Sequence, residues 1–129
     1  MKEISIGLLG LGTVGSGVVK IIENHQEKLM HQVGCPVKVK KILVKNMEKH
    51  LSNGVEASLL TTDVDDILND PEIDIVVEVM GGVDQTKQYL FQALNNKKHV
   101  VTANKDLMAL YGGKLLKTAS EDGCDLFFE

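Results

Sequence analysis

Three glycines near the amino terminus have the spacing of a phosphate-binding turn. Gly10, Gly12 and Gly15 form the pattern G-x-G-x-x-G, directly after the apolar run 4–9. In such a turn the first glycine allows a sharp change of direction, the second lets the backbone approach a phosphate, and the third lets the following helix pack closely on the strand. The free N–H groups and the positive dipole end of that helix attract an anion. The pattern favours a dinucleotide pyrophosphate site over a plain tight turn between strand and helix.

The residues after the second expected strand indicate which dinucleotide the site prefers. An NAD site usually has an Asp or Glu there that binds the ribose hydroxyls. This chain has Lys45 and Asn46 instead, and its next acidic residue is Glu48. A lysine suits the additional phosphate of NADP, so the sequence favours NADP, or use of both cofactors. The alternative is that Lys45 belongs to a solvated face with the lysines at positions 38, 40, 41 and 49.

Two later apolar runs also end in residues that suit a ligand site. The run 73–80 ends at Gly81-Gly82, and Glu78 interrupts it as either a site residue or an edge position that reaches solvent. The run 99–103 is followed by Asn104 and Lys105. Ligands of doubly wound sheets lie at the carboxyl ends of the strands, so Lys105 is placed to face the reactive end of a dinucleotide. The alternative for Lys105 is a solvated lysine at a helix start.

An acidic cluster at positions 63, 65 and 66 is compatible with a metal site. A simpler interpretation is a helix start, with Thr62 as the N-cap and the carboxylates in the first turn. We favour the helix start, with the helix running to about Asn69 before Asp70-Pro71 ends it.

Length, charge and composition narrow the class of protein. A chain of 129 residues indicates one domain. The net charge of −4 does not favour binding along a nucleic acid. Because the apolar runs are too short for a membrane span and the amino terminus has no signal-peptide pattern, we expect a cytoplasmic protein. The two cysteines, Cys35 and Cys124, form no metal-ligand cluster and are expected to be reduced.

Hydrophobic periodicity predicts alternating strands and helices. Strands are expected at 4–9, 37–44, 57–60, 73–80, 99–103 and 125–129, and helices at 13–31, 62–69 and 83–95. After a short turn at 106–110, the pair Gly112-Gly113 is expected to interrupt the chain before a last helix; residues 46–57 are expected to be an irregular connection.

Six strands separated by helices predict an α/β protein with a three-layer Rossmann fold. Its six-stranded parallel sheet is expected to have the order 3-2-1-4-5-6, with helices on both faces. This order places Cys35 and Cys124 about 19 Å apart, at about 4.8 Å per strand, whereas a disulfide needs Cα atoms within about 7 Å. Free thiols are therefore expected.

Three sequence blocks together resemble the homoserine dehydrogenase family. They are GLLGLGTVGSGV at 7–18, DIVVEVMGG at 74–82 and KKHVVTANKDLMA at 97–109, of which VVTANK (100–105) is the most specific. The likeness covers the nucleotide-binding domain alone. Family members continue from a motif like FFEAS into a substrate and dimerisation domain, and this chain ends within that motif. Residues 1–129 are thus expected to form an NAD(P)-binding domain without the substrate domain.

The resemblance implies the reversible reduction of aspartate 4-semialdehyde to homoserine by NAD(P)H, in threonine, methionine and isoleucine biosynthesis. It assigns the pyrophosphate to Gly10, Gly12, Thr13, Val14 and Gly15, the adenosine phosphate to Lys45, and the nicotinamide side to Met80, Gly81, Thr102 and Asn104. Lys105 is implied as a catalytic cation beside nicotinamide and substrate, where it could stabilise an alkoxide. The backbone carbonyl of Glu129 is implied as one ligand of a monovalent cation such as Na⁺.

The resemblance further implies a homo-oligomeric full-length enzyme, and a domain that binds cofactor but is inactive alone. Three alternatives stay open at this stage. The chain could be the first domain of another semialdehyde or amino-acid dehydrogenase, or a non-catalytic NAD(P)-sensing module. A methyltransferase is a third possibility, because glycine-rich turns also hold S-adenosylmethionine, although VVTANK and Lys45 argue against it.

Overall fold

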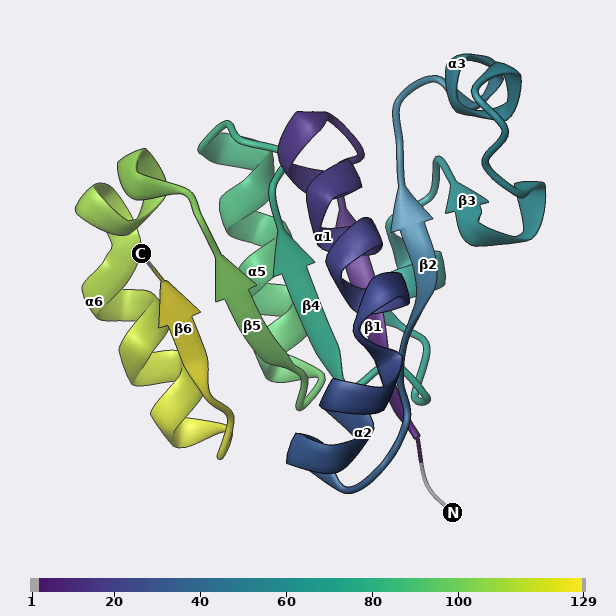
Figure 1. Ribbon diagram of the computed structural model, residues 1–129. Coiled ribbons are helices and arrows are strands. Elements are labelled where there is room, and N and C mark those ends of the chain that lie inside the picture. Colours follow the sequence, from purple (N-terminus) through teal and green to yellow (C-terminus); the bar gives the residue numbers. More distant parts are fainter. Residues whose placement is uncertain (1–2, 129) are drawn as a thin grey trace.

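Six parallel strands form one sheet in the order β3-β2-β1-β4-β5-β6 (Figure 1). The computed structural model describes residues 3–128. The strands are β1 (Ile4–Leu9), β2 (Val37–Leu43), β3 (Leu60–Thr61), β4 (Ile75–Glu78), β5 (His99–Thr102) and β6 (Leu126–Phe128). The expected α/β class and strand order are confirmed.

Helices cover the sheet from two sides (Figure 1). They are α1 (Thr13–Asn24), α2 (Gln26–Val33), α3 (Met47–Ser52), α4 (Asp65–Leu68), α5 (Asp84–Asn95) and α6 (Lys105–Glu121), with a 3₁₀ turn η1 (Ala57–Leu59) before β3. Helices α1 and α2 lie in front of the sheet in Figure 1, and α5 and α6 lie behind it. Among the helices of residues 3–128, none has both the length and the apolar composition needed to cross a membrane.

The strand β1 is buried on both faces, as expected for the middle of a parallel sheet. Leu8 packs on the α1 side with Ile42, whereas Leu9 packs on the opposite side in the cluster that contains Leu90 and Leu107. These leucines and Ile42 are at most 1% exposed. The glycine turn that follows β1 therefore starts from a fixed point in the core.

Strand β2 contains a bulge at Lys40. Ile6 pairs with Val39 and Gly7 with Lys41, so the register skips Lys40. Val39 before the bulge and Ile42 after it both pack with α1 residues on one apolar side. An unbroken alternation would turn Lys41 toward that side. Its amine instead donates to the Ser58 carbonyl oxygen at 2.9 Å.

The first long helix is broken, where one helix over 13–31 was expected. Helix α1 ends at Asn24 and α2 begins at Gln26. The Gln26 side-chain amide donates to the carbonyl oxygens of Ile22 (2.7 Å) and Val37 (2.9 Å). The Ile22 carbonyl oxygen thus accepts a side-chain N–H where a continuous helix would supply a backbone N–H. The same amide connects the break between the helices to β2.

The prediction of an irregular connection over 46–57 was wrong in part, because α3 lies within it. The side-chain oxygen of Asn46 accepts the Lys49 N–H at 3.3 Å and caps this helix. The strand expected at 57–60 is shifted, since η1 occupies 57–59 and β3 only Leu60–Thr61.

The helix start over the acidic cluster is confirmed in kind but not at Thr62. Helix α4 begins at Asp65, whose N–H donates to Asp63 Oδ1 at 3.0 Å. The Thr61 hydroxyl donates to Asp66 Oδ2 at 2.5 Å. Local hydrogen bonds therefore account for these carboxylates, and no group of metal ligands occurs among the described residues.

Helix α6 runs unbroken through Gly112 and Gly113, so the predicted interruption was wrong. Leu107, Leu115 and Ala119 form its buried face. Gly112 lies against Met108, whose Cε would be 3.1 Å from a Cβ at this position. Packing of a long apolar face outweighs the cost of about 1 kcal/mol that each glycine adds to a helix.

A polar cluster lies away from the glycine turns, where the chain enters β4 and β5. Lys40 Nζ contacts Asp70 Oδ2 at 2.7 Å and Glu72 Oε2 at 3.0 Å. These hydrogen bonds raise the pKa of Lys40, and although burial acts to raise the pKa of Asp70, the hydrogen bond from Lys40 lowers it overall. Burial lowers the pKa of Lys98, whose amine donates to the carbonyl oxygens of Asp70 and Ile73.

Both cysteines are free thiols, as expected. Burial, with a smaller contribution from Asp122, raises the pKa of Cys124.

Candidate nucleotide site

The first glycine turn joins β1 to α1. Gly10 has a φ of +109°, and its N–H donates to the Leu43 carbonyl oxygen at 3.0 Å. Gly12 is the exposed N-cap of α1, and a Cβ built there would have no neighbour within 4 Å. Thr13 and Val14 begin the helix and are exposed, so their N–H groups belong to the free amino end. The turn leaves open space in front of unpaired helical donors, which suits an anionic ligand.

Gly15 lies where α1 comes closest to the turn. It is buried, and a Cβ built there would lie 2.4 Å from the Gly10 carbonyl oxygen and 3.3 Å from Val79 Cγ2. Residue 15 therefore has no room for a side chain. This close approach is what the third glycine of the pattern was expected to allow.

A second glycine turn follows β4 and packs against the first. Gly81 and Gly82 have φ values of +76° and +78°, a region that favours glycine. A Cβ on Gly10 would lie 3.0 Å from Met80 Cα, so the two turns are in direct contact. Met80 and Gly81, both expected near a nicotinamide, are thereby placed beside the first glycine turn.

Glu78, the last residue of β4, is 1% exposed. Its Oε1 accepts the Thr102 hydroxyl at 2.6 Å, and its Oε2 accepts the N–H groups of Met80 (3.0 Å) and Gly81 (2.9 Å). The interpretation of Glu78 as an edge residue reaching solvent was wrong, because the neighbouring turn and β5 enclose the carboxylate.

The end of β5 leads directly into α6. The Thr102 hydroxyl points inward to Glu78 and accepts the Asn104 N–H at 3.1 Å. Asn104 caps α6, with its Oδ1 accepting the Leu107 N–H at 3.1 Å and its Nδ2 donating to the Gly82 carbonyl oxygen at 2.6 Å. Lys105 is the first residue of α6 and is exposed.

Two cavities open at this edge, and Val79 lines both. One, of about 350 Å³, brings together Val14, Gly81, Asn104 and Lys105. The other, of about 310 Å³, brings together Gly10, Gly12, Lys45 and Met80. Because both cavities are lined by Val79, just after the end of β4, they are adjacent and can receive the two halves of a dinucleotide.

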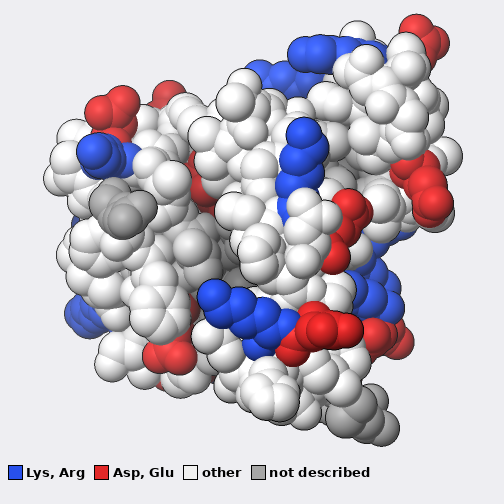
Figure 2. Space-filling model, viewed as in Figure 1, with Lys and Arg blue, Asp and Glu red and all other residues white. Residues whose placement is uncertain are grey.

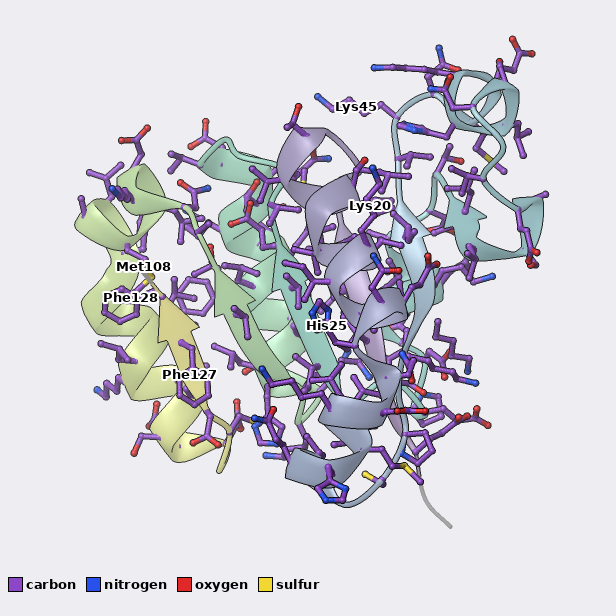
Figure 3. All side chains as sticks on the ribbon, viewed as in Figure 1. Lys20, His25, Lys45, Met108, Phe127 and Phe128 are labelled. Atoms are coloured by element: carbon purple, nitrogen blue, oxygen red, sulfur yellow. The ribbon has the colours of Figure 1, made fainter. Side chains whose placement is uncertain are left out.

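Lys45 lies on the loop after β2, and Figure 3 shows its side chain extending toward the amino end of α1. Lys49 and His50 of α3 line the same cavity, and Figure 2 shows positive charge along this upper margin. Sequence reasoning treated Lys49 only as part of a solvated face and did not find His50. The signal that could have placed them is Asn46 as an N-cap, followed by the apolar pair Met47 and Leu51 at helical spacing.

Apart from Glu129, the expected site residues lie at one edge of the sheet. Thr102 is among them, but its hydroxyl is turned into the protein toward Glu78. Glu129, the expected cation ligand, lies outside the described residues.

The site combines backbone N–H donors at the amino end of α1 with two open cavities, each of which is lined by a lysine. Gly12 fits a bound pyrophosphate because the space that its Cβ would occupy is open. Lys45 is the cation at one end and Lys105 the cation at the other. Such an edge can hold a dinucleotide and place its reactive half beside a lysine.

Comparison with known proteins agrees with this geometry. Residues 10–129 match the family model described as homoserine dehydrogenase, NAD binding domain. The chain is 65% identical to homoserine dehydrogenase of Bacillus subtilis (strain 168), with 100% of this chain covering 30% of that protein. It is 40% identical to the enzyme of Synechocystis, with 98% of this chain covering 29% of the relative.

Solved structures show the same relation. The crystal structure of S. aureus homoserine dehydrogenase at pH 7.0 has a TM-score of 0.90 at 48% identity, with 100% of this chain covering 33% of that one. The enzyme from Thiobacillus denitrificans has a TM-score of 0.92 at 41% identity, over 99% of this chain and 30% of the other. The chain spans about a third or less of the length of these relatives. It belongs to the homoserine dehydrogenase family, and it corresponds to the NAD-binding domain of that oxidoreductase.

Proposed function

We propose that residues 1–129 form the cofactor domain of an enzyme that interconverts homoserine and aspartate 4-semialdehyde with NADP, or with both NADP and NAD. The observation that supports this proposal most directly is the pair of adjacent cavities at the end of β4, one lined by Lys45 and the other by Lys105. The names of the relatives supply homoserine as the substrate, and the family resemblance supplies aspartate 4-semialdehyde as its oxidised partner.

In this proposal the first glycine turn holds the pyrophosphate. The N–H groups of Thr13 and Val14 point to the anion from the amino end of α1, and Gly10, Gly12 and Gly15 shape the turn. Lys45 binds the 2′-phosphate of the adenosine half. The lining of its cavity by Lys49 and His50 supports a phosphate there, because the Lys49 ammonium adds positive charge and the His50 ring adds a hydrogen-bond donor.

The nicotinamide half lies in the larger of the two cavities, against Gly81 and Asn104. Met80, which lines the adjoining cavity, and Thr102, which binds Glu78, support this half from beside it. The bound cofactor supplies the hydride. Lys105 is the catalytic cation: it faces the cavity from the start of α6 and stabilises the negative charge that develops on the substrate oxygen.

The remaining parts of the active enzyme belong to the region of the relatives that this chain does not cover. By family resemblance, that region supplies the homoserine-binding carboxylates and the general acid, and completes with Glu129 a site for a monovalent cation such as Na⁺. We propose that residues 1–129 alone bind cofactor without oxidising homoserine. We also propose that the full-length protein is a cytoplasmic homo-oligomer acting in threonine, methionine and isoleucine biosynthesis.

Titration of residues 1–129 with NADPH and with NADH, followed by nicotinamide fluorescence or heat, tests the cofactor assignment. We expect tighter binding of NADPH. In Lys45→Asp the NADPH affinity should fall about tenfold or more, because a charge-assisted hydrogen bond contributes about 1.5–3 kcal/mol. NADH binding should change much less.

Lys114→Asp is the matched control, because Lys114 is exposed on α6 and the substitution changes net charge equally. Equal affinity for both cofactors, unchanged in Lys45→Asp, would reduce Lys45 to a surface lysine. Absence of binding by either cofactor would contradict the proposal that residues 1–129 bind it alone.

A further inference from the structure

The carboxylate of Glu78 fills a concavity of backbone N–H groups. Two successive donors, the N–H groups of Met80 and Gly81, converge on Oε2 at 3.0 and 2.9 Å. Successive backbone N–H groups in a turn commonly bind an external anion. Here the anion is a side chain of the same chain, so these donors are already used, and the second glycine turn differs in this respect from the first.

Further hydrogen bonds link the same turn to α5 and α6. The Thr86 hydroxyl donates to the Gly81 carbonyl oxygen at 2.6 Å. Asn104 Nδ2 donates to the Gly82 carbonyl oxygen, also at 2.6 Å. The Thr102 hydroxyl donates to Glu78 and accepts the Asn104 N–H. The hydrogen bonds therefore form a closed ring from Glu78 through the turn, Asn104 and Thr102 back to Glu78, and this ring forms part of the wall of the larger cavity.

We infer that Glu78 is a positioning residue for the nicotinamide half of the cofactor: it holds the Met80–Gly82 turn at a fixed distance from Asn104 and Lys105. This inference rests on the proposed function of that cavity. Without the carboxylate, Gly81 and Gly82 at positive φ have many other accessible conformations. The turn would then lose its defined place opposite Lys105.

Only a carboxylate satisfies the three donors that meet at this point. An ionised carboxylate accepts at both oxygens, whereas a glutamine amide accepts at one atom and donates at the other. If the Glu78→Gln amide nitrogen faces Met80 and Gly81, donors oppose donors. If it faces Thr102, the hydroxyl hydrogen loses its acceptor. The glutamine variant keeps the size of the side chain and, in either orientation, leaves at least one donor at this point without an acceptor.

Asp74→Asn is the matched control at the other end of β4. Asp74 Oδ2 accepts the Ser5 N–H at 3.0 Å, so this change also replaces a carboxylate that binds a backbone donor. It directly precedes β4 and lines neither of the two cavities. Any general effect of replacing a carboxylate beside β4 should therefore appear in both variants.

The test compares NADPH with adenosine 2′,5′-bisphosphate, which carries only the adenosine half, on residues 1–129. We expect Glu78→Gln to weaken NADPH binding about tenfold and to leave bisphosphate binding within about twofold. Amide hydrogen exchange at Met80 and Gly81 should accelerate in the same variant. Asp74→Asn should change none of these three measurements.

Glu78→Asp is a second variant if Glu78→Gln does not fold. It keeps the charge but is one methylene shorter, so it cannot reach both the turn and Thr102, and the same selective loss is expected. Unchanged NADPH binding, or equal loss of both ligands, would overturn the positioning role while leaving the cofactor domain intact. If the wild-type chain binds neither ligand, the proposal that residues 1–129 bind cofactor alone fails, and this inference fails with it.

Discussion

The substitution Gly15→Ala should destabilise the protein relative to Gly17→Ala, although both add one methyl group to α1. A Cβ at residue 15 would lie 2.4 Å from the Gly10 carbonyl oxygen, whereas a Cβ at residue 17 meets nothing within 4 Å. Both positions lie inside the same helix. They therefore share the gain in helix propensity of up to about 1 kcal/mol and differ only in packing.

The size of the effect follows from how the contact can be relieved. A carbon–oxygen distance of about 3.3 Å is the short end of the ordinary range, so the contact must open by roughly 0.9 Å. Gly10 cannot yield freely, because its N–H is bonded to Leu43 and its backbone packs on Met80. Helix α1 must therefore move from the sheet, and such overpacking costs about 1–3 kcal/mol.

Urea unfolding followed by circular dichroism measures both variants. Gly17→Ala should raise the unfolding midpoint, consistent with a gain of about 0.5–1 kcal/mol. Gly15→Ala should unfold with the same slope at a midpoint lower than that of Gly17→Ala by about 1 M, given slopes of about 1–3 kcal/mol per M. Equal midpoints for the two variants would refute the claim that the third glycine is required for close packing.

Two further predictions concern titratable groups. Because the pKa of Asp70 is lowered from 3.8 in the folded protein, its pair with Lys40 stabilises above about pH 4, and this contribution is lost as the pH falls below that. Asp70→Asn should cost about 1 kcal/mol at pH 7, and the difference from wild type in urea unfolding should shrink as the pH falls below about 4. A difference that stays constant with pH would contradict this. The raised pKa of Cys124 should make it react with a thiol reagent at pH 8 more slowly in the folded chain than in urea, whereas equal rates would show that burial does not protect it.

The strand order could be predicted from the sequence because each strand carries its own signal. Continuous apolar runs, such as the one before Gly10, mark strands buried on both faces, and the connections between them leave few topologies. The positions of Lys45 and Lys105 followed from the same rule, since the residue after a parallel strand lies at the ligand edge.

Features that depend on distant contacts could not be predicted. The break between α1 and α2 requires Gln26 to reach the Val37 carbonyl oxygen, 11 positions away in the sequence. The continuity of α6 through Gly112 depends on packing that outweighs a local preference. Glu78 was a candidate from the sequence, but its role depends on Thr102, 24 positions away, and on a turn whose shape was not known.

The bulge at Lys40 determines which side chain arrives at the cofactor edge. Strand side chains alternate between faces, so one residue added to a regular strand exchanges the faces of everything after it. The bulge absorbs such an extra residue, because the pairing with β1 skips Lys40 and leaves Lys41 opposite Gly7. Deleting Lys40 would therefore keep the present directions of Val44 and Lys45. A substitution meant to change cofactor preference at Lys45 must therefore be aligned with a relative through the pairing of Gly7 with Lys41. In a relative without the bulge, counting residues from the start of the strand would select the residue next to the one intended.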